Sequence, residues 1–295
     1  MFNSKTVCKK IKINHHGKDV LFNKLSSYNN PKDNSIAFLS KFSDSSYNKI
    51  INKKDIFLIL PSNISKIFKS NAHAYCFSDN PKHTFFQIAE LYLNTSQQTS
   101  HISQSASVSS SVEIGNNVFI DKNAIVEGDC KIGDNVYIGK NTTITGKCVI
   151  GHNTYLGSNV LLGGSSLSVK YTDSVPSQNI QMGGIKIGEN CRIGMNSSVS
   201  RGTIDDTVIM NDVLMGEYVH IGHNAQISNN CVFTIRSTIC GSVNVRENCW
   251  FGPHSVVLSQ VEVGKNIKLA SNSVLYSNVS REGTYLGNPA KFFNI

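Results

Sequence analysis

The chain has 295 residues, of which 40% are hydrophobic and only 16% are charged, so it is neither disordered nor a highly charged helical protein. Its net charge of +8 suits partners that carry phosphates or an acidic carrier protein, but net charge does not report on fold. Residues 1–22 contain no apolar signal-peptide core, and no stretch is apolar enough to predict a membrane span. The eight cysteines form no CxxC motif, which argues against a zinc cluster and a secreted disulfide framework and predicts a cytoplasmic protein.

Residues 1–100 contain no internal repeat and are typical of a small α/β domain. The apolar runs at 36–39 and 56–60 predict strands. Residues 82–93, which follow Pro81, predict a helix with one apolar side. The polar residues 94–100 are then expected to link this domain to the rest of the chain.

The remainder of the chain carries a six-residue repeat. An aliphatic side chain recurs at every sixth position in a first run: Ile102, Val108, Ile114, Ile120, Val126, Ile132, Ile138, Ile144, Ile150, Leu156 and Leu162. After an interruption at 163–186 the pattern returns at Ile187, Ile193 and Val199, and it slips by four residues at 201–206. A third run follows: Ile209, Met215, Ile221, Ile227, Phe233, Ile239, Val245, Phe251, Val257, Val263, Leu269 and Leu275.

A period of six fits neither an α-helix nor an isolated strand. It fits a parallel β-helix in which each hexapeptide forms one wall, three hexapeptides complete a coil, and the aliphatic side chain points inward. Glycine and asparagine often follow the aliphatic residue, as at Gly115 and Asn117, and both tolerate corner geometry. We therefore predict a mainly β protein with a β-helix at 101–280, an insertion thrown out at 163–186, and a C-terminal tail at 281–295.

Five cysteines lie two residues before an inward aliphatic residue, where valine stands in other repeats: Cys130, Cys148, Cys191, Cys231 and Cys249. The shared position predicts that they are small buried hydrophobic residues and not reactive thiols.

Three motifs resemble those of the UDP-3-O-acylglucosamine N-acyltransferases of lipid A biosynthesis. Residues 201–207 read RGTIDDT, close to that family's RGALDDT, and residues 220–224 read HIGHN, close to its QIAHN. The segment that starts at Asn80-Pro81-Lys82 is similar to the helix that closes the family's N-terminal domain. The resemblance implies a left-handed β-helix, a homotrimer, and N-acyl transfer to a nucleotide-linked amino sugar, without metal or nucleic acid.

The resemblance also implies an active site around His223, which matches the family's general base. Imidazole titrates near neutral pH and can take the proton that an attacking amine sheds, although a solvated corner histidine such as His152 is the alternative. One coil further along, eighteen residues on, Gly241 matches the glycine whose N–H holds the oxyanion, unless it is only a turn glycine. Asn224 is expected to orient the histidine or hold the sugar, and His220 to share the cleft.

Further candidates concern the acceptor. Arg201 and the carboxylates of Asp205 and Asp206 are expected either to brace a corner or to line the acceptor site. In the family, two aromatic residues of the N-terminal domain clamp uracil, and the candidates here are Phe38 and Tyr47. The spacing of these two residues departs from the family's pattern.

The donor is expected to be an acyl-CoA or an acyl carrier protein thioester. The family's GADGFGY loop is absent at residues 163–167, and residues 287–291 read GNPAK, similar to acetyl-CoA-dependent sugar acetyltransferases, so Arg281 and Lys291 are candidates for contacting CoA phosphates. From these departures we expected a nucleotide-linked amino sugar of bacterial surface polysaccharide or lipopolysaccharide as acceptor. The alternatives are lipid A synthesis with acyl carrier protein and a non-catalytic β-helix scaffold.

Overall fold

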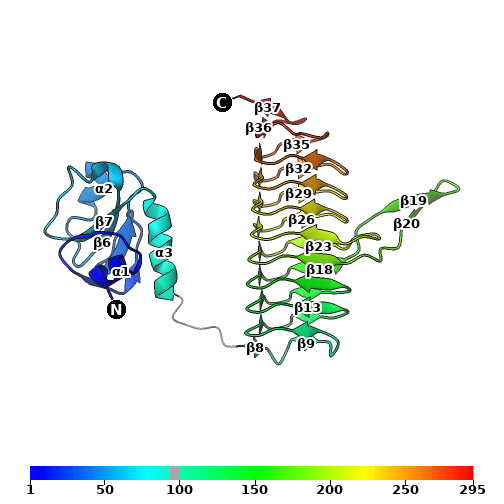
Figure 1. The fold of residues 1–295 in the computed structure, drawn as a ribbon, viewed down its shortest axis with the longest axis horizontal. Coiled ribbons are helices and arrows are strands. Elements are labelled where there is room, and N and C mark those ends of the chain that lie inside the picture. Colours follow the sequence, from blue (N-terminus) through cyan, green and yellow to red (C-terminus); the bar gives the residue numbers. More distant parts are fainter. Residues whose placement is uncertain (94–99, 295) are drawn as a thin grey trace. The chain divides into compact units, whose positions relative to one another are not determined.

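The computed structural model describes residues 1–93 and 100–294, and it divides into two compact units, Met1–Gln97 and Gln98–Ile295. The predicted polar linker falls almost entirely outside the described residues. Each unit is described by itself, and Figure 1 shows the ribbon of both.

The N-terminal unit is built on a five-stranded sheet in the order β2-β7-β6-β5-β4, parallel except for β2. The strands of this sheet and of a separate antiparallel pair, β1 and β3, are β1 (Phe2–Asn3), β2 (His15–Gly17), β3 (Leu21–Phe22), β4 (Lys24–Leu25), β5 (Ser35–Phe38), β6 (Phe57–Pro61) and β7 (Ala74–Ser78). The helices are α1 (Ser4–Lys10), α2 (Asp44–Asn48), α3 (Pro81–Leu93) and the short 3-10 helix η1 (Ser62–Ile64). The predicted α/β character, both predicted strands and the predicted helix are confirmed.

Two apolar clusters cover opposite faces of this sheet. Successive residues of a strand point to opposite faces, and along β5 Ile36 packs with Phe85 of α3, whereas Ala37 packs with Tyr75 in a second cluster. The face of the sheet on which a strand's aromatic residue lies therefore follows from whether its position along the strand is odd or even.

The C-terminal unit is a left-handed parallel β-helix, as predicted, and three sheets form its walls (Figure 1). Sheet 1 contains β10 (Glu113–Ile114), β13 (Cys130–Ile132), β16 (Cys148–Ile150), β21 (Ile185–Ile187), β24 (Thr207–Ile209), β27 (Gln226–Ile227), β30 (Asn244–Val245) and β33 (Glu262–Val263). Sheet 2 contains β8 (His101–Ile102), β11 (Phe119–Ile120), β14 (Tyr137–Ile138), β17 (Tyr155–Leu156), β22 (Arg192–Ile193), β25 (Leu214–Met215), β28 (Val232–Phe233), β31 (Trp250–Phe251), β34 (Ile267–Leu269), β36 (Gly283–Leu286) and β37 (Lys291–Phe293). Sheet 3 contains β9 (Ser107–Val108), β12 (Ile125–Val126), β15 (Thr143–Ile144), β18 (Leu161–Gly164), β23 (Ser198–Ser200), β26 (His220–Ile221), β29 (Thr238–Ile239), β32 (Val256–Val257) and β35 (Val274–Leu275).

The register follows the repeat that the sequence shows. Ile132 pairs with Ile150 in the next coil, and across the insertion Ile150 pairs with Ile187. From Ile120 onward the inward aliphatic residues are buried in one continuous core, whereas the most N-terminal repeats are more open, with Ile102 47% exposed. The five cysteines of the repeat are buried in this core, as predicted.

Asparagine side chains form a ladder along the corner between sheets 1 and 2. Their backbone has positive φ, which asparagine adopts more readily than most residues because its short polar side chain bonds locally. Each amide donates to the equivalent residue of the next coil, and the donors are, in order, Asn117, Asn135, Asn153 and Asn190. The last of these bonds ends on the carboxylate of Asp212, and a separate bond joins Asn230 to Asn248.

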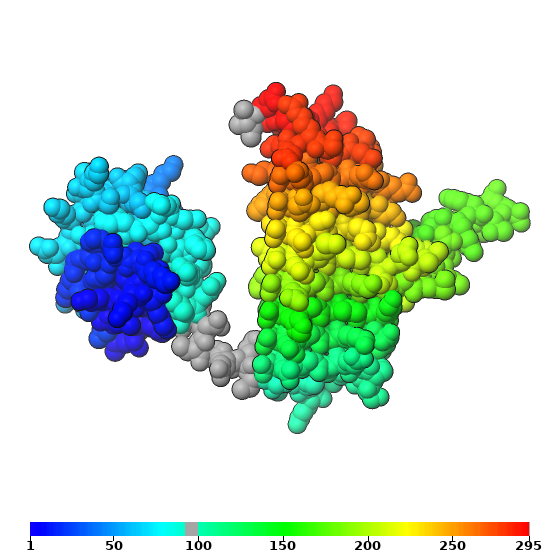
Figure 2. Space-filling model, viewed as in Figure 1, coloured from blue at the N-terminus to red at the C-terminus, as the bar shows by residue number. Residues whose placement is uncertain are grey.

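The insertion at 163–186 contains an antiparallel hairpin, β19 (Val169–Thr172) and β20 (Val175–Gln178), where we expected only a loop. The hairpin extends away from the coil as a thin projection (Figures 1 and 2). At the C-terminal end of the coil, β37 turns back and pairs antiparallel with β36. No helix within the described residues is long and apolar enough to cross a membrane.

Candidate active site

His223 lies at the corner between sheets 3 and 1, directly after β26. Its Nδ1 is 3.0 Å from Oδ1 of Asn224 and 3.4 Å from the Thr203 hydroxyl. The ring is therefore held from one side by its own neighbour and by the loop 201–206, where the repeat slips.

The hydrogen bonds of Asn224 determine which nitrogen of His223 carries a proton. The Thr203 N–H donates to Oδ1 of Asn224 (3.0 Å), and Nδ2 of Asn224 donates to the Asp205 carbonyl (2.9 Å). A peptide N–H can only donate and a carbonyl can only accept, so the amide orientation is fixed. Oδ1 then faces Nδ1 of His223 as an acceptor, and Nδ1 must carry the hydrogen. Neutral His223 is thereby left with an unprotonated Nε2, the form that a general base requires.

Gly241 lies in the next coil, against Nε2 of His223. A Cβ added to Gly241 would lie 2.5 Å from Nε2 and 2.8 Å from Cε1, so only glycine leaves room for this ring position. Among the described residues no acceptor is found for the Gly241 N–H. The structure thus brings together the histidine and the glycine that the repeat predicted to be stacked, and it leaves a free N–H beside the ring.

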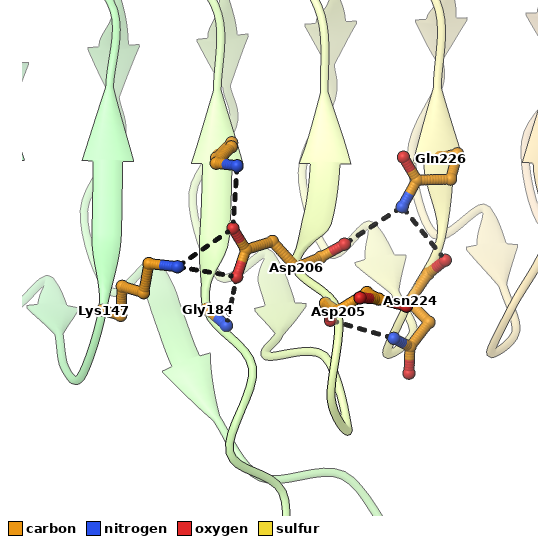
Figure 3. Close-up of polar contacts among 7 residues, drawn as sticks. Lys147, Gly184, Asp205, Asp206, Asn224 and Gln226 are labelled. Carbon is orange, nitrogen blue, oxygen red and sulfur yellow. Dashed lines mark hydrogen bonds and ion pairs between the residues drawn. The ribbon is translucent and has the colours of Figure 1, made fainter.

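The loop that carries Thr203 and Asp205 is fixed by Asp206 (Figure 3). The Asp206 carboxylate accepts from the Gly184 N–H (2.8 Å) and lies 3.0 Å from Lys186 Nζ and 3.4 Å from Lys147 Nζ. Burial opposes ionisation of Asp206, but the bonds from Lys186 and Gly184 and the charge of Lys147 outweigh it and lower the pKa of the carboxyl below its usual 3.8. These contacts favour the bracing role of Asp206 over a direct role at the acceptor.

Arg201 has a similar role at the base of the insertion. Its Nε donates to the Gly163 carbonyl, its backbone N–H donates to the Gly164 carbonyl (3.1 Å), and its guanidinium covers Gly146. Arg201 therefore joins three successive coils where the hairpin leaves the β-helix. The roles of Thr203 and Gly184 were missed because neither belongs to the six-residue pattern.

His220 points outward from β26, three residues before His223. Its Nδ1 lies 2.8 Å from the Ser198 hydroxyl. Burial lowers the pKa of His220, and the proximity of His223 adds to this effect. His220 is thus electrostatically coupled to His223 and favours the neutral state.

The structure does not bring Phe38 and Tyr47 together. Phe38 packs on the α3 face of the N-terminal sheet, with its ring centroid 5.0 Å from that of Phe85. Tyr47 packs against the other cluster, 5.2 Å from Phe68 and 5.9 Å from Phe42. Because the two rings lie on opposite faces of one sheet, they do not form the expected clamp within this unit.

Arg281 and Lys291 lie at the C-terminal end of the coil, away from the His223 corner. The Arg281 guanidinium lies over the Phe292 ring at 3.7 Å, and Lys291 is exposed in β37. In the part of the chain that the structure describes, no group of three or more His, Cys, Asp or Glu residues could hold a metal ion.

Comparisons with known proteins support the repeat and the fold. The family described as bacterial transferase hexapeptide (six repeats) matches residues 111–146 and 132–164, and the hexapeptide repeat of succinyl-transferase matches residues 182–204. Among solved structures, the UDP-N-acetylglucosamine acyltransferase from Campylobacter jejuni superposes with a TM-score of 0.60 at 24% identity, covering 66% of this chain and 75% of that one. The chain is a hexapeptide-repeat β-helix protein.

Among curated proteins, a UDP-3-O-acylglucosamine N-acyltransferase from Saccharophagus degradans is 49% identical over 47 residues, which cover 16% of this chain and 14% of that protein. The enzyme of the same name from Pseudomonas fluorescens is 33% identical over 81 residues, covering 28% and 23%. The matched segments thus span less than a quarter of the length of either relative. Over these segments the chain resembles the UDP-3-O-acylglucosamine N-acyltransferases, as its motifs predicted.

Proposed function

We propose that this protein is an N-acyltransferase that moves an acyl group from a thioester to the amino group of a UDP-linked amino sugar. The observation that carries the proposal is the arrangement of His223, with Nδ1 bonded to Asn224 and Nε2 facing Gly241. It supplies a base and a neighbouring free N–H, the two groups that acyl transfer to an amine needs.

In the proposed reaction the amine nitrogen attacks the thioester carbonyl, and Nε2 of His223 takes the proton that the nitrogen sheds. The C–N bond forms, and the Gly241 N–H stabilises the oxygen that becomes negative in the tetrahedral intermediate. The C–S bond then breaks, and the proton on Nε2 passes to the departing thiolate. Asn224 keeps the required tautomer throughout, and no metal takes part in these steps.

The names of the relatives support UDP-3-O-acylglucosamine as the acceptor. They favour the lipid A alternative over the broader group of surface-polysaccharide amino sugars that we expected from the altered loop at 163–167. The donor is then an acyl carrier protein thioester or an acyl-CoA, and Arg281 and Lys291 stay candidates for the CoA phosphates. We further propose a homotrimer.

The test compares the wild type with His223→Ala and with His152→Ala, which removes a histidine from the similar corner sequence Gly151-His152-Asn153. Each variant receives UDP-3-O-acylglucosamine or other UDP-amino sugars, with acyl carrier protein and CoA thioesters in parallel, and products are identified by mass spectrometry. We expect His223→Ala to lower kcat by about 10²–10⁴-fold and His152→Ala to leave it unchanged. A wild type that acylates none of these acceptors would favour the scaffold alternative, and an active His223→Ala would refute the assigned base.

A further inference from the structure

The coil contains a cluster of residues whose backbone is unusual for their side chains. Most corner residues with positive φ are asparagine, but five within the described coil are neither asparagine nor aspartate. They are Tyr218, Arg236, Ser242, His254 and Gln260. All five lie between residues 218 and 260, in the two coils that carry His223 and Gly241 and in the coil that follows them. Such conformations are unfavourable for tyrosine, arginine, serine and glutamine, whereas histidine tolerates them better. The clustering of the unfavourable residues therefore favours a function over a requirement of the fold.

Three of the five form one column at the corner between sheets 2 and 3. Tyr218, Arg236 and His254 have φ of 57°, 57° and 58° and occupy equivalent positions in successive coils. Asn196 holds this position in the coil before the column and Asn272 in the coil after it. Asn123, Asn141 and Asn159 also hold this position, so among the corner residues with positive φ the departure is confined to three consecutive coils.

The column faces the active-site corner across the width of one wall. Tyr218 precedes β26, and His223 follows the same strand. Arg236 likewise precedes β29, which Gly241 follows after Cys240. A substrate held at the column would thus extend along sheet 3 toward the base and the free N–H.

The chemistry of the column suits an anion. The Arg236 guanidinium lies over the Tyr218 ring at 5.3 Å, which orients it without using its N–H donors. No carboxylate within the described residues forms an ion pair with Arg236, and all three side chains are exposed. Arginine presents a planar set of donors to phosphate oxygens, and the tyrosine hydroxyl and the histidine ring add further donors.

We propose that Tyr218, Arg236 and His254 form a phosphate-binding subsite for one of the two co-substrates. This inference rests on the proposed function, in which both co-substrates carry phosphate: the diphosphate of the UDP-sugar and the phosphate of the donor's phosphopantetheine arm. Arg236 is a binding residue in this scheme, and its unfavourable backbone is retained because the charge is needed at that corner.

The test is the substitution Arg236→Asn, which restores the residue that this corner prefers. Arg246→Asn is the matched control, because Arg246 is also exposed on the coil but has no positive φ. Isothermal titration with UDP, CoA and inorganic pyrophosphate measures binding, and thermal unfolding measures stability. We expect Arg236→Asn to raise the melting temperature by about 2–4 °C and to weaken binding of UDP or of CoA about tenfold. Arg246→Asn should change neither quantity.

The outcomes distinguish the proposed phosphate-binding subsite from the proposed acyltransferase function. Weaker binding of UDP alone assigns the subsite to the acceptor, and weaker binding of CoA alone assigns it to the donor. Binding of pyrophosphate that depends on Arg236, without binding of UDP or CoA, supports the subsite but contradicts the proposed co-substrates. Unchanged affinity for every probe in Arg236→Asn, or no binding of any probe by the wild type, overturns the subsite even if the enzyme proves active.

Discussion

Replacing Gly241 with alanine tests the active-site geometry most directly. The new Cβ would lie 2.5 Å from Nε2 of His223, whereas ordinary contact begins at 3.4 Å, so the ring must move by about 0.9 Å. That movement opposes the bonds that hold Nδ1 to Asn224 and Thr203. Because a misplacement of about 1 Å can cost about 10²-fold in rate, we expect kcat/KM to fall about 100-fold, or about 2.7 kcal/mol in activation free energy.

The backbone of Gly241 does not have positive φ, so alanine should not strain the coil. Steady-state acyl transfer is measured alongside circular dichroism and thermal unfolding. Gly264→Ala is the control, because its Cβ also makes close contacts, at 3.0–3.1 Å, but with the backbone of Ser280 and Val279 and not with His223. A folded Gly241→Ala protein that keeps kcat/KM within threefold of the wild type would show that the close approach to His223 has no catalytic meaning.

Three further predictions concern the support of the site and the core. Asn224→Gly keeps a residue that tolerates positive φ but removes the side-chain amide that holds Nδ1 of His223, so kcat/KM should fall about tenfold or more. The control is Asn248→Gly, at another corner with positive φ, and an equal loss of activity there would contradict this role. The pKa of Asp206 lies below 3.8, so its stabilising effect is complete at neutral pH and is lost as pH falls through that lowered pKa. Asp206→Asn should therefore lower the unfolding free energy by about 1–2 kcal/mol at pH 7 but much less once the pH has fallen below that lowered pKa. A difference independent of pH in urea titrations would refute the charged brace. Phe233 is 1% exposed and stacks on Phe251 at 4.7 Å, so Phe233→Ala should cost about 3–5 kcal/mol in urea unfolding, and a cost below 1 kcal/mol would contradict tight packing.

The sequence was sufficient to predict the β-helix because its determinant is local and repeated. One inward aliphatic residue in six specifies each wall, and the eighteen-residue coil places Gly241 over His223 without any knowledge of the rest of the structure. The same register predicted that the repeat cysteines are buried.

The six-residue repeat could not predict contacts made by segments that lie outside it. Asp206 reaches Lys147 and Gly184 across the insertion, and periodicity carries no information about such a contact. Phe38 and Tyr47 were paired by resemblance to the family's uracil clamp, but the alternation of β5 directs Phe38 to the face of the sheet opposite Tyr47. In the small N-terminal unit, the face of the sheet decides which side chains meet.

The asparagine ladder bears on where the β-helix opens locally. An amide both donates and accepts, but the carboxylate of Asp212 only accepts, so the chain of bonds that arrives through Asn190 ends there. A new chain starts at Asn230, one coil later. Between these two rungs no amide-to-amide bond forms, but the Asn211 N–H donates to Oδ1 of Asn229 (2.9 Å) and the Asn230 N–H donates to the Asn211 carbonyl. In a solenoid each coil is stabilised mainly by its neighbours. The ladder is therefore interrupted at the coil that carries His223, where the Asn229 side chain replaces one of its rungs. Hydrogen exchange at the Asn211 and Asn230 amides would report how firmly that substitute holds the two neighbouring coils together.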